Sequence, residues 1–323
     1  MNISLERLTS EASETGFRPD MLEKVIHLIN LLNALRSHPF LKDKLALKGG
    51  TALNLFLFNV PRLSVDIDLN YVGAEDREDM LAERPKLEQA IQAVFSREGL
   101  TVRRMPGEHA GGKWSLRYQS ATGQGGNLEV DLNFMFRVPL WPLVTLNSHH
   151  VGSYQATDIP VLDIHEIAAG KLAALVARNQ ARDLFDSHQL LRREGIDRER
   201  LRIAFVVYGA MNRKDWRAVS IDDVAFDAAE LTRQLVPTLR TGALYEGDAL
   251  VEYARMLVEE CKQSLKAVLP LIGDESKFLD LLLDKGEIEP SLLTADEELC
   301  DRIKRHPLLK WKAINVRKHK GIS

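Results

Sequence analysis

The chain has 323 residues, of which 45% are hydrophobic and 28% are charged, with a net charge of -3. These values are typical of a soluble globular protein with a sizeable core, and the length favours two domains. The slightly negative balance excludes a polycation that binds nucleic acid over its whole surface.

The first predicted elements alternate between helix and strand. Apolar residues at helical spacing predict a helix over 21–38, and Pro19 and Asp20 precede it as a start signal. A short apolar run over 45–47 leads into Gly49 and Gly50, and a helical stretch follows over 51–58. Residues 65–72 alternate apolar and polar, which is the period-two pattern of a strand with one buried face.

The middle of the chain predicts one helix and then a run of strands. Residues 76–98 form a long charged helical pattern, and strand patterns follow over 100–105, 113–119 and 127–136. The connections over 107–113 and 121–126 are rich in glycine, as expected between antiparallel strands.

After Pro160 the sequence predicts helices and no strand of comparable strength. Asp163 and Glu166 have capping-box spacing and predict a helix through about Val176. Further helical patterns lie near 182–193, 197–212, 222–235, 246–270, 275–285 and 295–305. We therefore expect an α+β domain over residues 1–160 and a helical domain over residues 161–323.

The first candidate motif is the turn formed by Gly49, Gly50 and Thr51 between a strand and a helix. Glycine permits a sharp turn and a close approach of a phosphate, and free N–H groups at a helix start attract negative charge. The Thr51 hydroxyl either caps the helix or donates to a phosphate oxygen. Taken alone, the turn is more typical of a plain helix entry than of a ligand site.

The second motif is a pair of carboxylates on one strand. Asp66 and Asp68 are two residues apart, so both side chains project from the same face, while Val65, Ile67 and Leu69 face the core. Two carboxylates this close repel each other unless a cation lies between them, and Mg²⁺ is the usual one. A solvated acidic face is the alternative, which the nearby glycine turn disfavours.

A third motif repeats this alternation, with Glu129 and Asp131 on one face of a later strand. A neighbouring antiparallel strand would bring a third carboxylate beside the first pair, as two-metal phosphoryl or nucleotidyl transfer requires. We favour Asp131 over Glu129 as that metal ligand, because its shorter side chain matches the Asp pair.

A fourth motif places cations at the start of the helical half. Lys171 and Arg178 are seven residues apart, so they share a helix face, and Arg182 and Asp183 begin the next helix. Lys171 is placed to reach a triphosphate, and Asp183 either orients Lys171 or caps its helix. A surface lysine with an ordinary Arg–Asp pair is the alternative. His165 and His188 are interpreted as structural, because neither has a metal-ligand partner at a useful spacing.

The C-terminal segment is strongly basic. From Arg302 to Ser323 there are eight Lys or Arg residues and no Asp or Glu. A solvated, partly frayed terminus and an RNA-facing arm are both open at this point. Trp311 lies within the segment, where it either stacks on a base or anchors the tail in the core.

Other features bear on location. Cys261 and Cys300 have no CxxC or Cys–His spacing, which argues against a disulfide framework or zinc site and favours a reducing cytoplasm. The acidic N-terminus has no apolar core of a signal peptide, and no apolar run approaches the roughly 20 residues that span a bilayer. We expect a soluble, cytoplasmic protein that does not enter membranes.

These motifs, in this order, resemble the AbiEii family of nucleotidyltransferase toxins, which includes the MenT toxins. The resemblance covers roughly residues 45 to 190. It rests on three stretches: Gly49-Gly50-Thr51-Ala52-Leu53, Arg62-x-Ser64-x-Asp66-x-Asp68-Leu69, and Lys171 through Arg178 to Arg182-Asp183-x-x-Asp186.

The resemblance implies a fold and a set of residue roles. The fold is a polymerase β-like nucleotidyltransferase domain with a mixed sheet, followed by a helical domain that completes the nucleotide site and contacts the substrate. Asp66 and Asp68 are implied metal ligands, and Lys171 and Asp183 complete the catalytic set. Implied contacts with the nucleotide come from the glycine turn, Thr51, Arg62, Ser64, Arg178 and Arg182.

The resemblance also implies a biological role. The implied role is that of a toxin of a toxin–antitoxin or phage-defence system, which moves a nucleotide from an NTP to RNA with Mg²⁺. The tRNA 3′ acceptor end is the implied acceptor, and the partner is an antitoxin that does not always form a stable complex. Alternatives are transfer to a protein or small-molecule hydroxyl, phosphorylation of RNA or protein, and a non-catalytic nucleotide-binding module.

Overall fold

The computed structural model describes residues 3–107, 110–178, 180–241 and 247–321. Residues 108–109 of the first glycine-rich connection and residue 246 of a predicted helix therefore lie outside the described part. The chain forms two compact units, and several segments alternate between them. Unit 1 comprises Met1–Arg137, Leu143–Leu162 and Pro237–Gly242, and unit 2 comprises Val138–Pro142, Asp163–Val236 and Ala243–Ser323.

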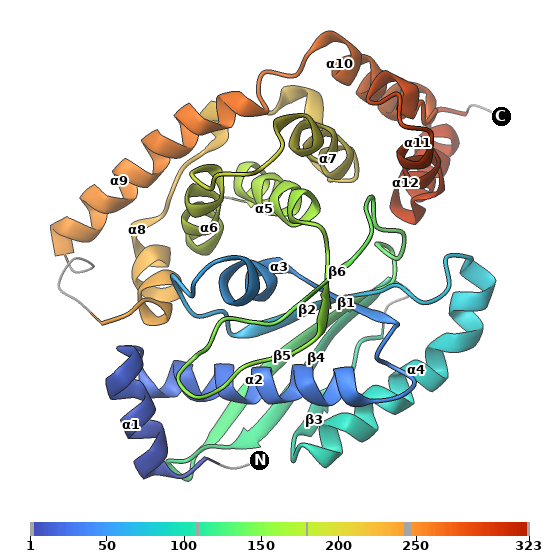
Figure 1. The fold of residues 1–323 in the computed structure, drawn as a ribbon. Coiled ribbons are helices and arrows are strands. Elements are labelled where there is room, and N and C mark those ends of the chain that lie inside the picture. Colours follow the sequence, from blue (N-terminus) through green and yellow to red (C-terminus); the bar gives the residue numbers. More distant parts are fainter. Residues whose placement is uncertain (1–2, 108–109, 179, 242–246, 322–323) are drawn as a thin grey trace. The chain divides into compact units, whose positions relative to one another are not determined.

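Unit 1 is built around a seven-stranded mixed sheet with the order β3-β4-β5-β2-β1-β7-β6 (Figure 1). This confirms the expected α+β class. The strands are β1 (Leu45–Lys48), β2 (Asp66–Tyr71), β3 (Thr101–Arg104), β4 (Gly111–Gln119), β5 (Gly125–Asn133), β6 (Val144–Leu146) and β7 (Ile159–Val161).

The pairing of β2 differs from the prediction. β2 runs antiparallel to β1 but parallel to β5, where the sequence suggested an antiparallel neighbour. The chain leaves β2 through helix α4 (Arg77–Arg97) and the β3–β4 hairpin before β5 begins, and such a long crossover brings a strand back in parallel. The β3–β4 and β4–β5 pairs are antiparallel, as predicted.

Helices α2 (Pro19–Ser37) and α4 cover the apolar face of this sheet. The ring of Phe95 on α4 meets Trp114 on β4 edge to face at 5.5 Å. His27 on α2 lies against Tyr118 of the same strand, with ring centroids 4.1 Å apart. Because Trp114 pairs in register with Val130 of β5, the face that these helices cover is the one that carries the buried aliphatic residues of β5.

Three small elements of unit 1 were not predicted. Helix α1 (Leu5–Thr15) follows the N-cap Ser4, whose side chain accepts from the Arg7 N–H, and β6 and β7 have only three residues each. Runs this short show no periodicity, and β7 contains Pro160, which argues against a strand. β7 nevertheless extends the sheet as a parallel neighbour of β1.

Unit 2 is helical, as predicted for this half. Its longer helices are α5 (Ile164–Arg178), α6 (Ala181–Leu191), α7 (Arg198–Ala210), α9 (Gly247–Ser264), α10 (Gly273–Asp280), α11 (Glu297–Arg305) and α12 (Pro307–Lys320). The helix predicted over 222–235 is instead broken into short pieces, with α8 (Ala228–Glu230) and η4 (Leu231–Leu235) at its end. In the core of unit 2, the ring of Phe205 on α7 packs on the ring of Trp216, with ring centroids 5.1 Å apart.

One prediction about a helix end in unit 2, the capping box of Asp163 and Glu166, needed correction. The Asp163 side chain accepts from the backbone N–H of His165, but Glu166 does not return to complete a capping box. Glu166 is buried instead, where it accepts hydrogen bonds from the Trp141 N–H and the Tyr208 hydroxyl.

Among the helices within the described ranges, none is long and apolar enough to span a membrane.

Candidate functional site

Four carboxylates lie side by side on the polar face of the unit 1 sheet. In the parallel pairing of β2 with β5, Asp66 lies opposite Glu129 and Asp68 lies opposite Asp131. The residues between them, such as Ile67 and Val130, are buried on the face covered by the helices. The strand alternation predicted from sequence therefore places two adjacent pairs of acidic side chains on one face. We call these four residues the carboxylate row.

Two lysines flank the carboxylate row on the neighbouring strands. Lys113 on β4 lies opposite Asp131, and its Nζ is 2.9 Å from the Glu129 carboxylate. The hydrogen bond from Lys113 to Glu129, together with the charges of Asp66 and Asp131, raises the pKa of Lys113 above its usual value. Lys48 ends β1 opposite Asp68. Both strands next to the carboxylate row thus carry a lysine, and Lys113 forms an ion pair with one member of the row.

The chemistry of the carboxylate row fits a hard divalent cation. Mg²⁺ prefers oxygen ligands, which the carboxylates on these adjacent strands supply. A cation between close carboxylates also relieves their mutual repulsion. As placed in the described part of the chain, however, no three acidic, His or Cys side chains form a group that could hold a metal ion. Metal binding by Asp66, Asp68 and Asp131 therefore stays a prediction, which the register of the strands makes chemically reasonable.

The glycine turn supports the carboxylate row directly. Gly49 follows β1 with φ of +71°, in the left-handed region that favours glycine, and opens α3 (Gly49–Thr51). A Cβ atom at this position would collide with the Asp68 carboxylate. Gly50 follows in helical conformation, and its carbonyl accepts from the Asn54 side chain at 2.9 Å. The first glycine is thus required for the close approach of Asp68.

Thr51 connects this turn to β2. Its side chain is fully buried, and its hydroxyl donates a hydrogen bond to the backbone carbonyl of Asp66. The prediction left helix capping and phosphate contact open for Thr51. In this structure the hydroxyl does not cap the helix. It fixes the start of the strand that carries both aspartates, and its contact with a phosphate stays a prediction.

Arg62 and Ser64 precede β2 and are also buried. Only 2% of Arg62 is exposed, and its Nη1 donates to the Leu63 carbonyl at 2.7 Å. The next backbone N–H, that of Leu63, donates to the Thr238 carbonyl. The structure therefore shows both residues within the packed segment that leads into β2, and their contact with a nucleotide stays a prediction.

The cations predicted in the helical half form an ion-pair cluster within unit 2. The Lys171 ammonium lies 2.8 Å from Asp183 and 2.9 Å from Asp186, and Arg178 lies 2.8 Å from the other Asp183 oxygen. Burial alone would raise the pKa of Asp183, but Lys171 and Arg178 hold it below its usual value. Of the two roles predicted for Asp183, the structure shows that it orients Lys171.

The accessible member of this cluster is Arg178, because only 10% of the Lys171 side chain is exposed. Arg178 has 55% of its side chain exposed, whereas Asp183 and Asp186 are buried. Arg182 lies half-buried in the first turn of α6. The cluster therefore consists of buried carboxylates that hold Lys171 in place and an exposed guanidinium beside it.

The two histidines interpreted as structural have protein partners. His165 Nδ1 is 2.7 Å from Asp163, and its Nε2 is 3.0 Å from the Asp197 backbone nitrogen. His188 Nε2 is 2.7 Å from Glu260. Both rings are buried. These contacts use both nitrogens of His165, whereas His188 Nδ1 has no hydrogen-bond partner among the described residues.

Lys113 and the buried Glu166 were missed from the sequence. Lys113 alternates with Trp114 on β4, so its place on the polar face was available from the strand pattern once the partner of β5 was known. Burial raises the pKa of Glu166 to about 7, despite hydrogen bonds from backbone groups and Tyr208 that lower it. No local signal separates such a buried Glu from a helix cap.

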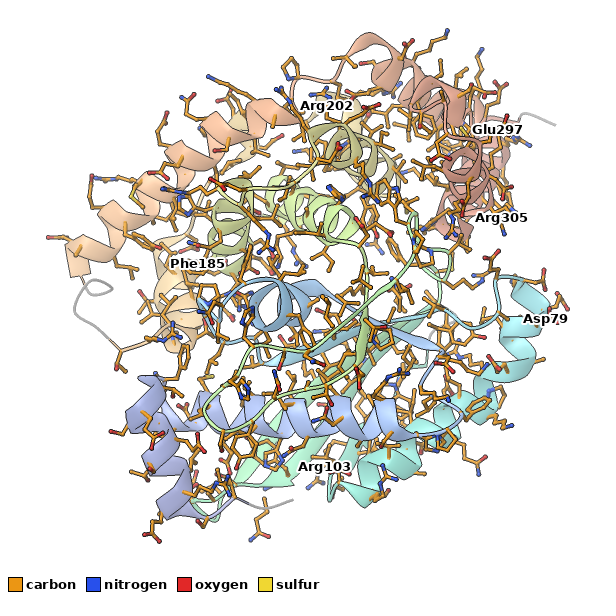
Figure 2. The ribbon with its side chains drawn as sticks, in the orientation of Figure 1. Asp79, Arg103, Phe185, Arg202, Glu297 and Arg305 are labelled. Atoms are coloured by element: carbon orange, nitrogen blue, oxygen red, sulfur yellow. The ribbon has the colours of Figure 1, made fainter. Side chains whose placement is uncertain are left out.

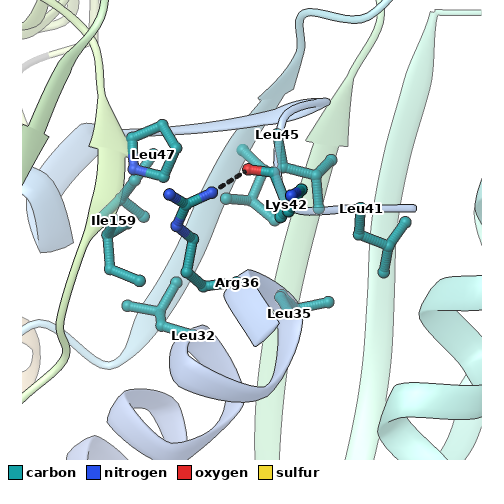
Figure 3. Close-up of a pocket in the computed structure, with 10 residues that line it drawn as sticks. Leu32, Leu35, Arg36, Leu41, Lys42, Leu45, Leu47 and Ile159 are labelled. Atoms are coloured by element: carbon teal, nitrogen blue, oxygen red, sulfur yellow. Dashed lines mark hydrogen bonds between the residues drawn. The ribbon is translucent and has the colours of Figure 1, made fainter. Parts of the chain in front are cut away.

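A small pocket in unit 1 lies away from the carboxylate row. It has a volume of about 20 Å³, which is room for about one water molecule, and apolar side chains such as Leu32, Leu47 and Ile159 line it (Figure 3). Arg36 at its edge donates to the Lys42 carbonyl at 2.9 Å. The pocket shares no residue with the carboxylate row and gives no reason to place chemistry there.

Comparisons with known proteins bear on the whole site. A family model described as nucleotidyl transferase AbiEii toxin, type IV toxin–antitoxin system, matches residues 30–259, a range that includes both clusters. Among solved structures, the chain is similar to MenT4, a nucleotidyltransferase toxin from Mycobacterium tuberculosis H37Rv. The identity is 18% and the TM-score 0.59, over 94% of this chain and 98% of that one, so this likeness shows the fold. No curated protein matches the chain.

Proposed function

Because this chain belongs to the AbiEii family of nucleotidyltransferase toxins of type IV toxin–antitoxin systems, we propose that it transfers a nucleotide from an NTP to RNA. The acceptor in this proposal is the 3′ end of tRNA, and its modification blocks translation. The observation that supports the chemistry best is the carboxylate row, which places Asp66 and Asp68 in register with Glu129 and Asp131.

The metal in this proposal is Mg²⁺, held by Asp66, Asp68 and Asp131. When bound, it neutralises charge that develops on the phosphate oxygens and steadies the leaving pyrophosphate. The protein's own part is to fix the carboxylates. Gly49 leaves room for Asp68, and Thr51 ties the backbone of Asp66 to the helix start.

In this proposal the cations Lys171, Arg178 and Arg182 of unit 2 bind the triphosphate of the nucleotide. Lys171 is oriented by Asp183 and Asp186, so its position is fixed before a ligand arrives. Arg178 and Arg182 supply further positive charge. Such pre-organised cations favour a triphosphate more than flexible surface lysines do, because less side-chain freedom is lost on binding.

The reaction joins a hydroxyl oxygen of the acceptor to the α-phosphorus of the NTP and breaks the bond to pyrophosphate. It depends on positioning and charge neutralisation and needs no covalent intermediate with the enzyme. The residues of the two clusters supply these functions in the proposal. A cytoplasmic location follows from the substrates, and an antitoxin encoded with the toxin is the proposed partner in toxin–antitoxin control or phage defence.

The test is incubation of the purified protein with total tRNA, Mg²⁺ and each α-labelled NTP in turn. We expect label on tRNA with one NTP, and its loss in the nearly isosteric variant Asp66→Asn. Glu129→Gln is a matched control, because Glu129 lies opposite Asp66 on the same face and already pairs with Lys113. If Asp131 is the third ligand, Glu129→Gln keeps its activity and Asp131→Asn does not.

Three outcomes would contradict parts of the proposal. An Asp66→Asn protein with wild-type activity would exclude the carboxylate row as the site. Label that transfers only from the γ-phosphate would identify a phosphotransferase. α-Label that appears on a protein or a small molecule, and not on RNA, would change the acceptor and keep the nucleotide chemistry.

A further inference from the structure

The basic C-terminal segment forms a regular helix in the structure. Helix α12 begins at Pro307, after the N-cap His306, and ends at Lys320 before the left-handed Gly321. Leu309 and Ala313 are buried along one side. Lys312 Nζ donates to the Asn212 carbonyl at 2.7 Å, and Arg317 Nε donates to the Gly286 carbonyl at 3.0 Å. The segment is therefore attached to unit 2 and is not a frayed end.

The opposite side of α12 carries an exposed stripe of aromatic, aliphatic and cationic residues. Lys310, Ile314 and Lys318 follow each other at intervals of four, and Trp311 lies beside them. This spacing places all four on one side of a helix. Trp311 is 55% exposed and Ile314 is 63% exposed. The structure thus decides against Trp311 as a buried anchor. We call these four residues the Lys–Trp stripe.

The cations of the Lys–Trp stripe differ from the other basic residues near the C-terminus. On α11, where Figure 2 labels Glu297 and Arg305, Arg302 pairs with Glu298 at 2.9 Å and Arg305 pairs with Asp301 at 2.7 Å. Within the part of the chain that the structure describes, Lys310 and Lys318 form no ion pair. Helix α12 contains no Asp or Glu. The stripe therefore presents uncompensated positive charge to solvent.

The composition of the Lys–Trp stripe favours an RNA strand as its ligand. An indole face stacks on an unpaired base, and lysine ammonium groups on either side contact backbone phosphates. From Lys310 to Lys318 the helix rises about 12 Å, at 1.5 Å per residue. A membrane surface is less well matched, because an interfacial helix needs a broad apolar face and this stripe offers only two apolar side chains.

We propose that the Lys–Trp stripe of α12 binds an unpaired segment of the RNA acceptor. The identity of the ligand rests on the proposed function, in which RNA is the substrate, whereas the exposure and charge of the stripe do not. The stripe gives the protein affinity for RNA through residues that belong neither to the carboxylate row nor to the ion-pair cluster of Lys171, Arg178, Asp183 and Asp186.

The experiment measures RNA binding without catalysis. Fluorescence polarisation of a labelled, unstructured RNA oligonucleotide is recorded without NTP for the full chain and for two variants, Trp311→Ala and the double variant Lys310→Glu/Lys318→Glu. Removal of one stacking ring weakens binding about 5- to 150-fold. The slope of log K against log salt falls by about 0.7 for each phosphate that is no longer neutralised, and so by about 1.4 in the double variant.

Matched controls separate the stripe from general charge and folding effects. Lys266→Glu/Lys277→Glu makes the same change of charge at two exposed lysines elsewhere in unit 2, and we expect it to bind RNA like the wild type. Trp311→Phe keeps an aromatic face and should retain most of the affinity that Trp311→Ala loses. Thermal unfolding checks that each variant is folded, and Asp66→Asn should bind RNA normally.

Several results would overturn the proposal. These are equal RNA affinity in the wild type and both stripe variants, equal weakening by the control charge reversals, or a wild type that does not bind RNA. Binding to phosphatidylserine vesicles but not to RNA, abolished in Trp311→Ala, would assign the stripe to a membrane surface. Failure of α-label transfer, with RNA binding that still depends on the stripe, would refute only the proposed function.

Discussion

The clearest test of the candidate site is the substitution Gly49→Ala. At this position φ is +71° and an added Cβ would collide with the Asp68 carboxylate. The left-handed backbone costs a residue with a Cβ about 1–2 kcal/mol. Relief of the collision also requires Asp68 to move, and a displacement of about 1 Å in a catalytic group lowers a rate by about 100-fold. We therefore expect modest destabilisation and a large loss of nucleotide transfer.

A second glycine separates these two effects. Gly99 has φ of +74°, but a Cβ there would meet nothing within 4 Å. Gly99→Ala therefore carries the backbone strain without the collision. Urea unfolding should show a loss of about 1–2 kcal/mol for Gly99→Ala and a somewhat larger loss for Gly49→Ala. α-Label transfer should fall about 100-fold only in Gly49→Ala.

Two results would refute this account of Gly49. A folded Gly49→Ala protein that transfers label at the wild-type rate would show that Asp68 does not need its place beside the glycine turn. Loss of activity in both variants to the same degree would show that backbone strain, and not the position of the carboxylate, limits catalysis.

Three further changes test the electrostatics of the protein. Lys171→Met leaves Asp183 and Asp186 buried without their shared cation. The free energy of unfolding, measured in urea at pH 7, should therefore fall by about 3–5 kcal/mol. A loss below about 1 kcal/mol would contradict this expectation. The pKa of Glu166 is raised to about 7 from 4.5, so the native state holds an extra proton between these values and loses stability as pH rises through them. The free energy of unfolding of Glu166→Gln should lack this decline with pH, which amounts to about 3 kcal/mol in the wild type. If the free energies of unfolding of the two proteins instead run parallel against pH, the raised pKa of Glu166 is refuted. Lys113→Ala removes the cation that pairs with Glu129 beside the carboxylate row. Calorimetric titration with Mn²⁺ should therefore show severalfold tighter binding, and unchanged or weaker binding would speak against a metal site there.

The sequence predicted the local arrangement of the candidate site better than its long-range partners. Asp66 and Asp68 share a face because strand geometry requires it, whatever the rest of the chain does. Their neighbours Glu129 and Asp131 were identified as candidates, but the direction of the strand that carries them was not. Pairing between strands about 60 residues apart depends on the path of the intervening crossover, which local patterns do not encode.

Burial was the second property that the sequence did not determine. Glu166 has the spacing of a capping box, yet it is held inside unit 2 by Trp141 and Tyr208. Trp311 was equally compatible with an anchor and with an exposed ring, and only the packing of α12 shows that it is exposed. In both cases the side chain's surroundings come from residues distant in sequence.

The division of the chain between its two units has a consequence for the order of synthesis. The segment Pro237–Gly242 belongs to unit 1, where the Thr238 carbonyl accepts from the Leu63 N–H and the Thr241 N–H donates to the Gly16 carbonyl. Domains generally fold as units while the chain emerges from the ribosome. Unit 1 therefore lacks these contacts until residue 241 of the 323 has been made. A ribosome that stalls earlier, or a message cut short, yields a chain in which the segment leading to Asp66 and Asp68 is incompletely held.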